Sequence, residues 1–434
     1  MVAKNYCRLA EHLLYAETYL GKAYAILSDQ PLHGVPPLQV PDGSTKADPG
    51  CRYSITLPAK NEAEGIEAAL RALHRQIDHR GRPIDQSIYE VILLANNCTD
   101  DTAAIARAYA DDHPDFHLHV IEITIPPEVA CIGLVRRLLA DLAVARLPAD
   151  GVICTTDADS VVDTRWLYYN QRAIARGAQV VGGRIVVRQT ARSSYRKTHL
   201  QDVTYRMLQM LLESIIDPCA EDPWPRHFQA FGPSIAIRKA AYLACGGMPV
   251  TRCIEDIELT WALERIDVKI VHDPAIKVYT SDRESDRIDG IAFSHTLDEW
   301  TRMEHEGRKP VVWGLQHCIM LFKWKVALRR AFRERRIGNS PALFALADYL
   351  EMPYTELEDR IVRAPTAGAL YQEFRRILEH THSFSDAPFE EAIRELRRFT
   401  RSARCGGGPS ASTRPDGSAR PGRCVRSENP EVLA

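Results

Sequence analysis

The sequence predicts an α/β fold with a mostly parallel, Rossmann-like sheet flanked by helices and a helical C-terminal extension. From residue 51 onward, short β-rich runs alternate with amphipathic helical segments. This alternation is typical of a parallel sheet covered on both faces. Beyond about residue 295 the pattern is helical only. The 434 residues are enough for one large domain with an appendage, or for two or three smaller domains.

The elements follow one another in a regular order. The first strands are predicted at 53–57, 89–95, 117–123 and 151–156, and the helices between them at 61–77, 99–112 and 131–147. Apolar residues at helical spacing, such as Ile66, Leu70 and Leu73, support the first helix. Further on we expect strands at 178–187 and 232–238, and helices at 195–216 and 254–266. The stretches KIVHDP (269–274) and KVYTSDR (277–283) close the region.

Four segments are expected along the chain. Residues 1–50 drift into a Pro- and Gly-rich stretch and are interpreted as an extension or linker. Residues 51–295 form the α/β domain, and 296–400 form a helical region. Residues 401–434 are rich in Gly, Ser, Pro and Arg and have little apolar content, which predicts a disordered, dispensable tail.

Composition excludes several classes of protein. The formal net charge is −2, so no global basic field argues for nucleic acid. None of the eleven cysteines stands in a C-x-x-C spacing, which argues against a zinc ribbon and favours reduced thiols. We see no secretory signal and no apolar run of about 18 residues, so we expect a cytoplasmic protein.

Three polar stretches follow predicted strands. They read PAKNEAEG, ANNCTDDT and TTDADS. In a parallel sheet, ligands bind beyond the carboxyl ends of the strands. Asp157 and Asp159 stand one residue apart there, and because like charges repel, a positive group is expected nearby. A plain turn remains one interpretation, and a divalent ion that holds phosphate oxygens is the other.

Several stretches occur in the order of one known family. They are PAKNE (58–62), ANNCTDDT (95–102), the helix bearing Arg136 and Arg137, TTDADS (155–160), GPSIAIR (232–238), LACGGMP (243–249) and IEDIELTWAL (254–263). Each is weakly specific alone, but in this order residues 51–295 resemble the family 2 glycosyltransferases, which have the GT-A fold. The resemblance implies a hexosyltransferase-like enzyme that moves a sugar from a nucleotide-diphosphate sugar to an acceptor hydroxyl, with inversion.

The resemblance also implies a divalent cofactor, Mg²⁺ or Mn²⁺, at the Asp-x-Asp motif. Asp159 would be the more direct metal ligand, with Asp157 also near the metal and in contact with the ribose or sugar of the donor. Hard ions of this kind prefer carboxylate oxygens. Glu62 would bind the nucleotide ribose, although an acidic residue in a first helical turn is also favoured by the helix dipole.

The remaining expected contacts to the donor match the family pattern less well. The backbone near Pro58 and Ala59 would lie against the base. Asn96 replaces an aspartate that the family often uses there, so the base need not be uracil; a capped helix start is the alternative interpretation. Arg137 would reach the donor, unless its helix face is simply solvated. Arg283 would fold over the diphosphate, although DRIDGI (286–291) departs from the glycine-rich family pattern.

Catalysis needs a base that takes the proton of the acceptor hydroxyl. By resemblance this base is Asp256, with Glu255 as a supporting contact. The alternative is acidic capping of a helix N-terminus. A sugar nucleotidyltransferase and a non-catalytic nucleotide-sugar-binding scaffold are rival functions. The first would need a Gly-rich, basic phosphate loop after the first strand, and the second would be expected to lose Asp159 or Asp256.

One basic stretch raises a question of location. Residues 323–336 hold seven Lys or Arg and one acid, interleaved with apolar residues. Such a stretch can lie on an anionic membrane surface, which makes weak membrane contact a hypothesis. We prefer a helix that packs on the catalytic domain and leaves a basic side in solvent.

Overall fold

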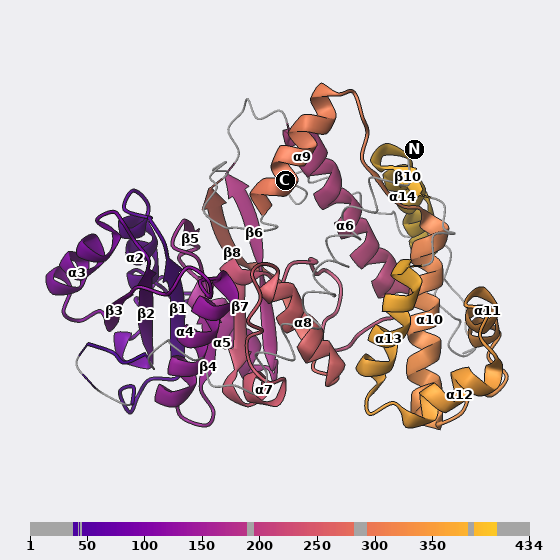
Figure 1. Cartoon of the computed structure of the whole chain (residues 1–434), viewed down its shortest axis with the longest axis horizontal. Coiled ribbons are helices and arrows are strands. Elements are labelled where there is room, and N and C mark those ends of the chain that lie inside the picture. Colours follow the sequence, from indigo (N-terminus) through magenta and orange to yellow (C-terminus); the bar gives the residue numbers. More distant parts are fainter. Residues whose placement is uncertain are drawn as a thin grey trace, which may run out of the picture.

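A computed structural model describes residues 38–41, 43, 46–188, 195–281, 293–380 and 386–405. Its centre is an eight-stranded sheet in the order β3-β2-β1-β4-β7-β6-β8-β5 (Figure 1). The strands are β1 (Tyr53–Ala59), β2 (Tyr89–Asn96), β3 (Leu118–Ile123), β4 (Val152–Thr155), β5 (Ser160–Val162), β6 (Val180–Arg188), β7 (Ile235–Arg238) and β8 (Ile270–Ser281). The predicted α/β class with a mostly parallel sheet is confirmed.

The sheet departs from an all-parallel arrangement on one side. β7 is antiparallel to both β4 and β6, and β5 is antiparallel to β8. The closing stretches KIVHDP and KVYTSDR contribute to one continuous strand, β8, which ends at Ser281. Its register with β6 shifts between Gly183 and Arg184, which accommodates the break in the sequence pattern. β5 was not expected from the sequence.

Helices cover both faces of the sheet. One face carries α2 (Ile66–His74), α3 (Thr102–Asp112) and α5 (Trp166–Ala175). The other carries α4 (Ile132–Arg146), α7 (Lys239–Ala244) and α8 (Glu255–Arg265). Neighbouring residues of β2 point alternately into the two cores, so that Leu93 packs in the first and Leu94 in the second. β2 is therefore buried on both faces, as a central parallel strand should be.

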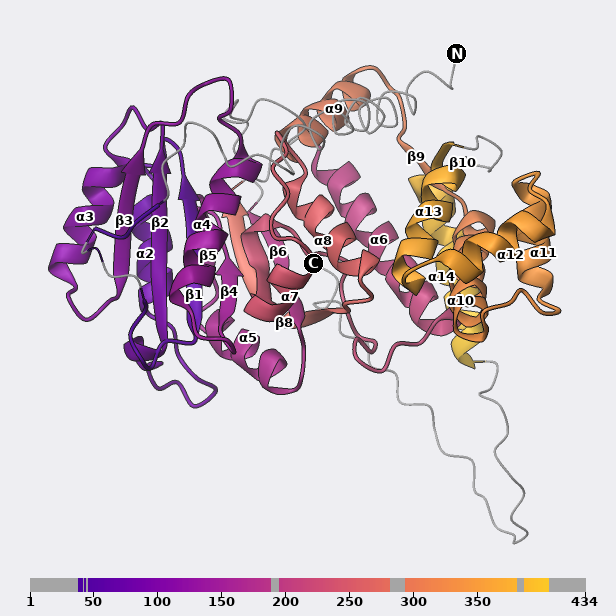
Figure 2. The same cartoon turned by 60° about the horizontal axis from the view of Figure 1, so that its bottom comes forward.

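The expected helical region follows the sheet in the chain. It contains α9 (Phe293–His305), α10 (Leu315–Glu334), α11 (Pro341–Tyr349), α12 (Tyr354–Arg363), α13 (Ala367–His380) and α14 (Phe389–Cys405). A two-stranded ribbon joins β9 (Val311–Trp313) to β10 (Asp386–Pro388). Figures 1 and 2 show α6 (Arg196–Ile216) between the sheet and the helices α10 to α14. Tyr205 and Leu212 of α6 share a core with Phe389 and Leu396 of α14.

The ordered structure extends slightly beyond the boundaries expected at residues 51 and 400. Val40 is 2% exposed and Leu38 packs against the sheet, so residues before 51 take part in the core. α14 ends at Cys405, so its last five residues, 401–405, belong to the segment that was expected to be a disordered tail. Its exposed arginines made these residues look like tail, whereas the buried Thr400 keeps the helix docked. Residues 406–434 lie outside the described part of the chain.

The basic stretch at 323–336 lies on α10 and just beyond it. Lys325 donates to Glu213 of α6 at 3.0 Å, and Arg329 pairs with Asp217 after the same helix. Trp324 and Leu328 are buried. The stretch therefore packs against the domain through some of its cations, and membrane contact through it stays a hypothesis. Among the described helices, none is both long and apolar enough to cross a bilayer.

Candidate active site

The loops after β1 and β2 are tied together by side-chain bonds to the backbone. Asn61 has a φ of 55° and its Oδ1 accepts from the Thr99 amide at 2.8 Å. The Glu62 amide donates to Thr102 Oγ1 at 2.7 Å, and the Ala63 amide donates to Asp100 Oδ2 at 3.0 Å. Asn96 ends β2 and is 9% exposed. The polar residues of this stretch thus both start α3 and hold the two loops at one edge of the sheet.

Four of the expected donor contacts lie at this edge. Pro58 and Ala59 end β1, and they stand opposite Leu94 and Ala95 of β2. Glu62 lies in the loop after β1, and Asn96 is the last residue of β2. The structure therefore places these residues together, as a shared nucleotide contact would require.

The Asp-x-Asp turn follows β4, the strand beside β1. Asp157 and Asp159 are partly exposed, and the Ser160 amide donates to the Asp157 carbonyl at 3.1 Å, which closes the turn. Ser160 Oγ donates to Asp159 Oδ1 at 2.9 Å. The Thr156 hydroxyl is buried and has no hydrogen-bond partner within the described residues. This leaves an unmatched polar atom beside the carboxylates.

The positive group expected near the aspartates is Arg136 of α4. Its Nη2 donates to Asp157 Oδ1 at 2.5 Å, and its Nε donates to Glu255 Oε1 at 2.9 Å. Its side chain is only 7% exposed. Buried charges are tolerated when they are paired and hydrogen-bonded, and Arg136 satisfies this with two carboxylates. It therefore joins the Asp-x-Asp turn to the start of α8.

Gly232 lies where these elements meet. Its amide donates to Asp256 Oδ2 at 2.8 Å, and its carbonyl accepts from Thr155 Oγ1 at 2.6 Å. A Cβ at this position would meet Arg136 Nη2 at 2.4 Å, so a side chain would displace the guanidinium. The absence of a side chain thus lets α4 approach the loop before β7.

The two acids at the start of α8 have altered acidity. Burial and the neighbouring Asp256 charge raise the pKa of Glu255 to about 7, although Arg136 opposes the shift. Burial likewise raises the pKa of Asp256, against the Gly232 amide and Arg136. Ile254, just before them, has a φ of 57°, an uncommon conformation for a β-branched residue. A carboxylate with a raised pKa is a stronger base, which suits proton abstraction near neutral pH.

Arg137 points to a different place from Arg136. Its Nε donates to Asp141 at 2.6 Å, and its Nη1 donates to the carbonyls of Gly246 and Met248 at 2.9 and 3.3 Å. The structure thus brings Arg136, and not Arg137, to the Asp-x-Asp turn. Arg283, the other expected arginine, lies outside the described residues.

Sequence reasoning missed Arg136 because a charge was assumed to face solvent. A signal was available, since Arg136 shares helical spacing with the buried Leu139, Ala140 and Ala143. A charged residue within an apolar stripe predicts a buried partner of opposite charge.

The oxygen ligands of the Asp-x-Asp turn suit a divalent metal ion whose remaining coordination positions are filled by the substrate. Among the residues described, no cluster of three or more His, Cys, Asp or Glu could hold a metal alone. Mg²⁺ usually keeps several waters and takes only one or two carboxylates, with phosphates filling other positions. Asp157 is paired with Arg136, whereas Asp159 accepts a hydrogen bond from Ser160 Oγ. The hard oxygens of this turn therefore fit Mg²⁺ or Mn²⁺.

The family model described as glycosyl transferase family 2 matches residues 54–232. This range contains β1, the Asp-x-Asp turn, Arg136 and Gly232. No curated protein matches the chain.

Three solved structures are similar to this chain at low identity. S. aureus TarS 1–349 in complex with UDP-GlcNAc is 15% identical, with 83% of this chain and 93% of that chain covered and a TM-score of 0.40. The mannosyltransferase PcManGT from Pyrobaculum calidifontis, with GDP-Man and Mn²⁺, is 15% identical, with 91% and 93% covered and a TM-score of 0.38. M. tuberculosis glucosyl-3-phosphoglycerate synthase is 18% identical, with 61% and 84% covered and a TM-score of 0.32. All three TM-scores are below 0.5, so the ligands in these structures describe those proteins alone.

Proposed function

We propose that this chain, whose residues 54–232 match the family model described as glycosyl transferase family 2, transfers a sugar from a nucleotide-diphosphate donor to an acceptor hydroxyl with inversion and with a divalent metal. The observation that carries the proposal is the joining of the Asp-x-Asp turn to the Glu255–Asp256 pair through Arg136. One buried cation thus holds the expected donor-binding acids and the expected base in a fixed relation.

The donor would lie across the ends of β1, β2 and β4. The loops at Pro58, Glu62 and Asn96 would hold the nucleoside. Asp157 would contact the ribose or sugar, and Asp159 would hold Mg²⁺ or Mn²⁺ together with the donor phosphates. When bound, the ion would offset the negative charge that builds on the diphosphate as the glycosidic bond breaks. Arg137 and Arg283 remain expected donor contacts.

Asp256 would act as the base. Its two oxygens accept from the Gly232 and Ile257 amides at 2.8 and 2.7 Å, which fixes the carboxylate. Each carboxylate oxygen has a second lone pair, so the group can still accept a proton. It would take the acceptor proton as that oxygen attacks C1 of the sugar from the face opposite the leaving diphosphate. Glu255, bonded to Arg136, would support this geometry without contacting the proton.

The acceptor would approach over the turn at Gly246 and Gly247. Both glycines have a positive φ, 89° and 82°, and Arg137 holds the Gly246 carbonyl. Apart from the two chain neighbours of Gly246, no described residue has an atom within 4 Å of where its Cβ would stand, which would leave room there for a sugar or other hydroxyl-bearing acceptor. Arg137 therefore supports the acceptor side of the site even where it does not touch the donor.

A thermal-shift screen tests this function. Nucleoside diphosphates bound to the native state raise its melting temperature, and a metal-dependent site does so only with Mn²⁺ or Mg²⁺ present. We expect one diphosphate to stabilise the chain with Mn²⁺ and much less with EDTA. The matching nucleotide sugar should then be hydrolysed or transferred with release of that diphosphate. Formation of a nucleoside triphosphate from the nucleotide sugar and added pyrophosphate would instead indicate a nucleotidyltransferase, and binding without turnover would indicate a scaffold.

A further inference from the structure

The last described helix, α14, has two contrasting faces. Ala392, Leu396 and Thr400 are buried, and Leu396 belongs to a core shared with α6 and α10. The opposite face carries arginines at helical spacing, all of them exposed: Arg394, Arg397, Arg398 and Arg401. The helix is thus fixed in place by its apolar side, and it presents a line of guanidinium groups to solvent.

These four arginines have no acidic partner among the residues that the structure describes. Glu390, one turn before Arg394, pairs instead with Lys197 and Lys309, at 3.6 and 3.3 Å. Like charges three and four residues apart destabilise a helix. The chain as a whole has a net charge of −2, so this concentration of positive charge does not follow from composition.

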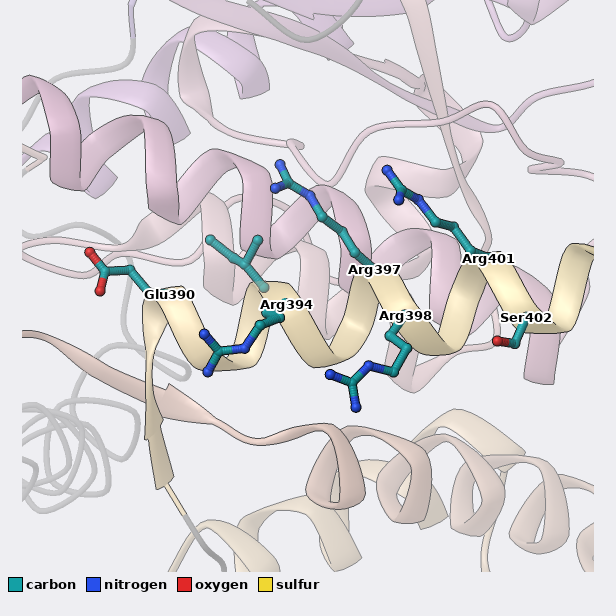
Figure 3. Close-up of a pocket in the computed structure, with 7 residues that line it drawn as sticks. Glu390, Arg394, Arg397, Arg398, Arg401 and Ser402 are labelled. Atoms are coloured by element: carbon teal, nitrogen blue, oxygen red, sulfur yellow. The ribbon is translucent and has the colours of Figure 1, made fainter. Parts of the chain in front are cut away.

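The arginines border a hollow of about 530 Å³, which Glu390 and Ile393 also line. In Figure 3, Arg397 and Arg401 extend from one side of α14, and Arg394 and Arg398 extend from the other. Within each pair the residues are four apart, which is about 6 Å along the helix axis. Ser402 adds a hydroxyl at one end of the hollow. We call this feature the arginine trough.

We propose that the arginine trough binds a linear polyanion, a chain of phosphate groups that lies along α14 between the two rows of guanidinium groups. Arginine matches phosphate with two parallel hydrogen bonds and is weakly hydrated, so it is well suited to this contact. A chain can meet both rows over their full length, whereas a single phosphate ion can meet only one or two groups. The proposal goes beyond sugar transfer and does not depend on it, because it concerns binding alone.

An anionic membrane fits the trough less well. Helices that lie on membranes bury an apolar face in the lipid. The apolar face of α14 is already packed against the protein, and none of the exposed large hydrophobic residues in the described part belongs to α14. The guanidinium groups also line a hollow, which follows a chain better than a flat surface.

The test uses the full chain and a linear inorganic polyphosphate, with fluorescence anisotropy at several salt concentrations. The quadruple variant changes Arg394, Arg397, Arg398 and Arg401 to Gln. Its control removes the same charge from four exposed arginines that have no acidic partner in the described part of the chain, through Arg75→Gln, Arg80→Gln, Arg176→Gln and Arg333→Gln. A third variant changes the four trough residues to Lys, which keeps the charge and loses the paired hydrogen bonds.

We expect the trough-to-Gln variant to bind polyphosphate about thirtyfold more weakly, since four exposed charge pairs each add a small increment. The slope of log affinity against log salt should fall by about one for each arginine removed. The control should bind like the wild type, and the Lys variant should keep the slope with lower affinity. The Lys variant also keeps the test valid should the Gln variant fold poorly.

Three results would overturn the proposal. Equal loss in the control would mean that only net charge matters. Competition by orthophosphate at equal total phosphate would mean that the trough holds single ions. Pelleting with phosphatidylglycerol vesicles, together with no polyphosphate binding, would assign the trough to a membrane surface.

Discussion

Arg136 Nη2 lies 2.5 Å from Asp157 Oδ1, and this contact joins the middle of the sequence-predicted third helix to the turn after β4. It accounts for how two aspartates can stand together at the end of a buried strand. Because the same guanidinium also bonds Glu255, the pair is one half of a bridge between two acidic motifs that lie about a hundred residues apart in the chain.

Replacing Arg136 should disturb both stability and activity. Arg136→Met removes the only side-chain hydrogen-bond partner that the buried Glu255 has among the described residues, and we expect the free energy of unfolding to fall by about 3 kcal/mol. Sugar transfer should fall at least about a hundredfold, since the donor-binding turn and α8 would lose their common support. Chemical denaturation and initial-rate kinetics measure the two effects.

Arg137→Met is the matched control, because it changes the neighbouring residue of the same helix. Its pair with Asp141 is half-exposed, so we expect a loss of under about 1 kcal/mol. Adding Glu255→Gln to Arg136→Met should recover part of the lost stability, because the buried carboxylate of Glu255 that lost its partner is then replaced by a neutral amide. If Arg137→Met raised the donor KM as much as Arg136→Met, the donor contact would lie at Arg137 and our geometric assignment would be wrong.

Asp159→Asn should abolish metal-dependent donor binding and leave the fold intact. The amide keeps the size of the side chain but is a much poorer ligand for a hard divalent ion. Calorimetry with a nucleoside diphosphate and Mn²⁺ measures the change. Asp150→Asn, an exposed aspartate before the same strand, is the control and should bind normally. Unchanged affinity in Asp159→Asn would remove Asp159 from the metal site.

Acid should destabilise the fold through His227. Burial lowers the pKa of His227 to about 3, with the neighbouring His272 as a further cause, and its ring Nε2 has no partner among the described residues. The unfolded chain takes up this proton near pH 6.5 and the native state does not. The contribution of neutral His227 to stability is therefore full above pH 6.5, and it is lost as pH falls toward 3.

Between pH 7 and 5 this effect should lower the free energy of unfolding by about 2 kcal/mol. His227→Asn should show a correspondingly shallower pH dependence, whereas the exposed control His79→Asn should follow the wild type. Urea denaturation at several pH values provides the comparison. Parallel pH profiles for wild type and His227→Asn would show that His227 titrates normally in the native state.

Much of the fold could be predicted because its strands are short apolar runs and its first helices have clean periodicity. β2 and α4 both appeared within two residues of their observed bounds. α5 was missed because the polar Asn170 interrupts its apolar stripe of Trp166, Leu167, Ala173 and Ile174. Asn170 is buried all the same, since its Nδ2 donates to the Trp166 carbonyl at 3.0 Å.

The residues of the candidate active site could likewise be predicted only in part. Asp157, Asp159, Glu255 and Asp256 could be proposed because they stand at predicted strand and helix ends. Arg136 could not be told apart from Arg137, because only tertiary packing decides which of two neighbouring arginines enters the core. Gly232 was likewise unremarkable in sequence, and its role follows from the approach of Arg136 and Asp256 to one point.

The most direct test of the account is the transfer rate of Asp256→Asn under donor saturation, measured beside its affinity for the donor. Asparagine keeps the acceptor oxygen that can bond the Gly232 amide, but it cannot take a proton at neutral pH. We expect kcat to fall at least about a thousandfold while the donor Kd stays within about threefold of wild type. A kcat within tenfold of wild type, with the fold intact, would contradict the assignment of Asp256 as the base.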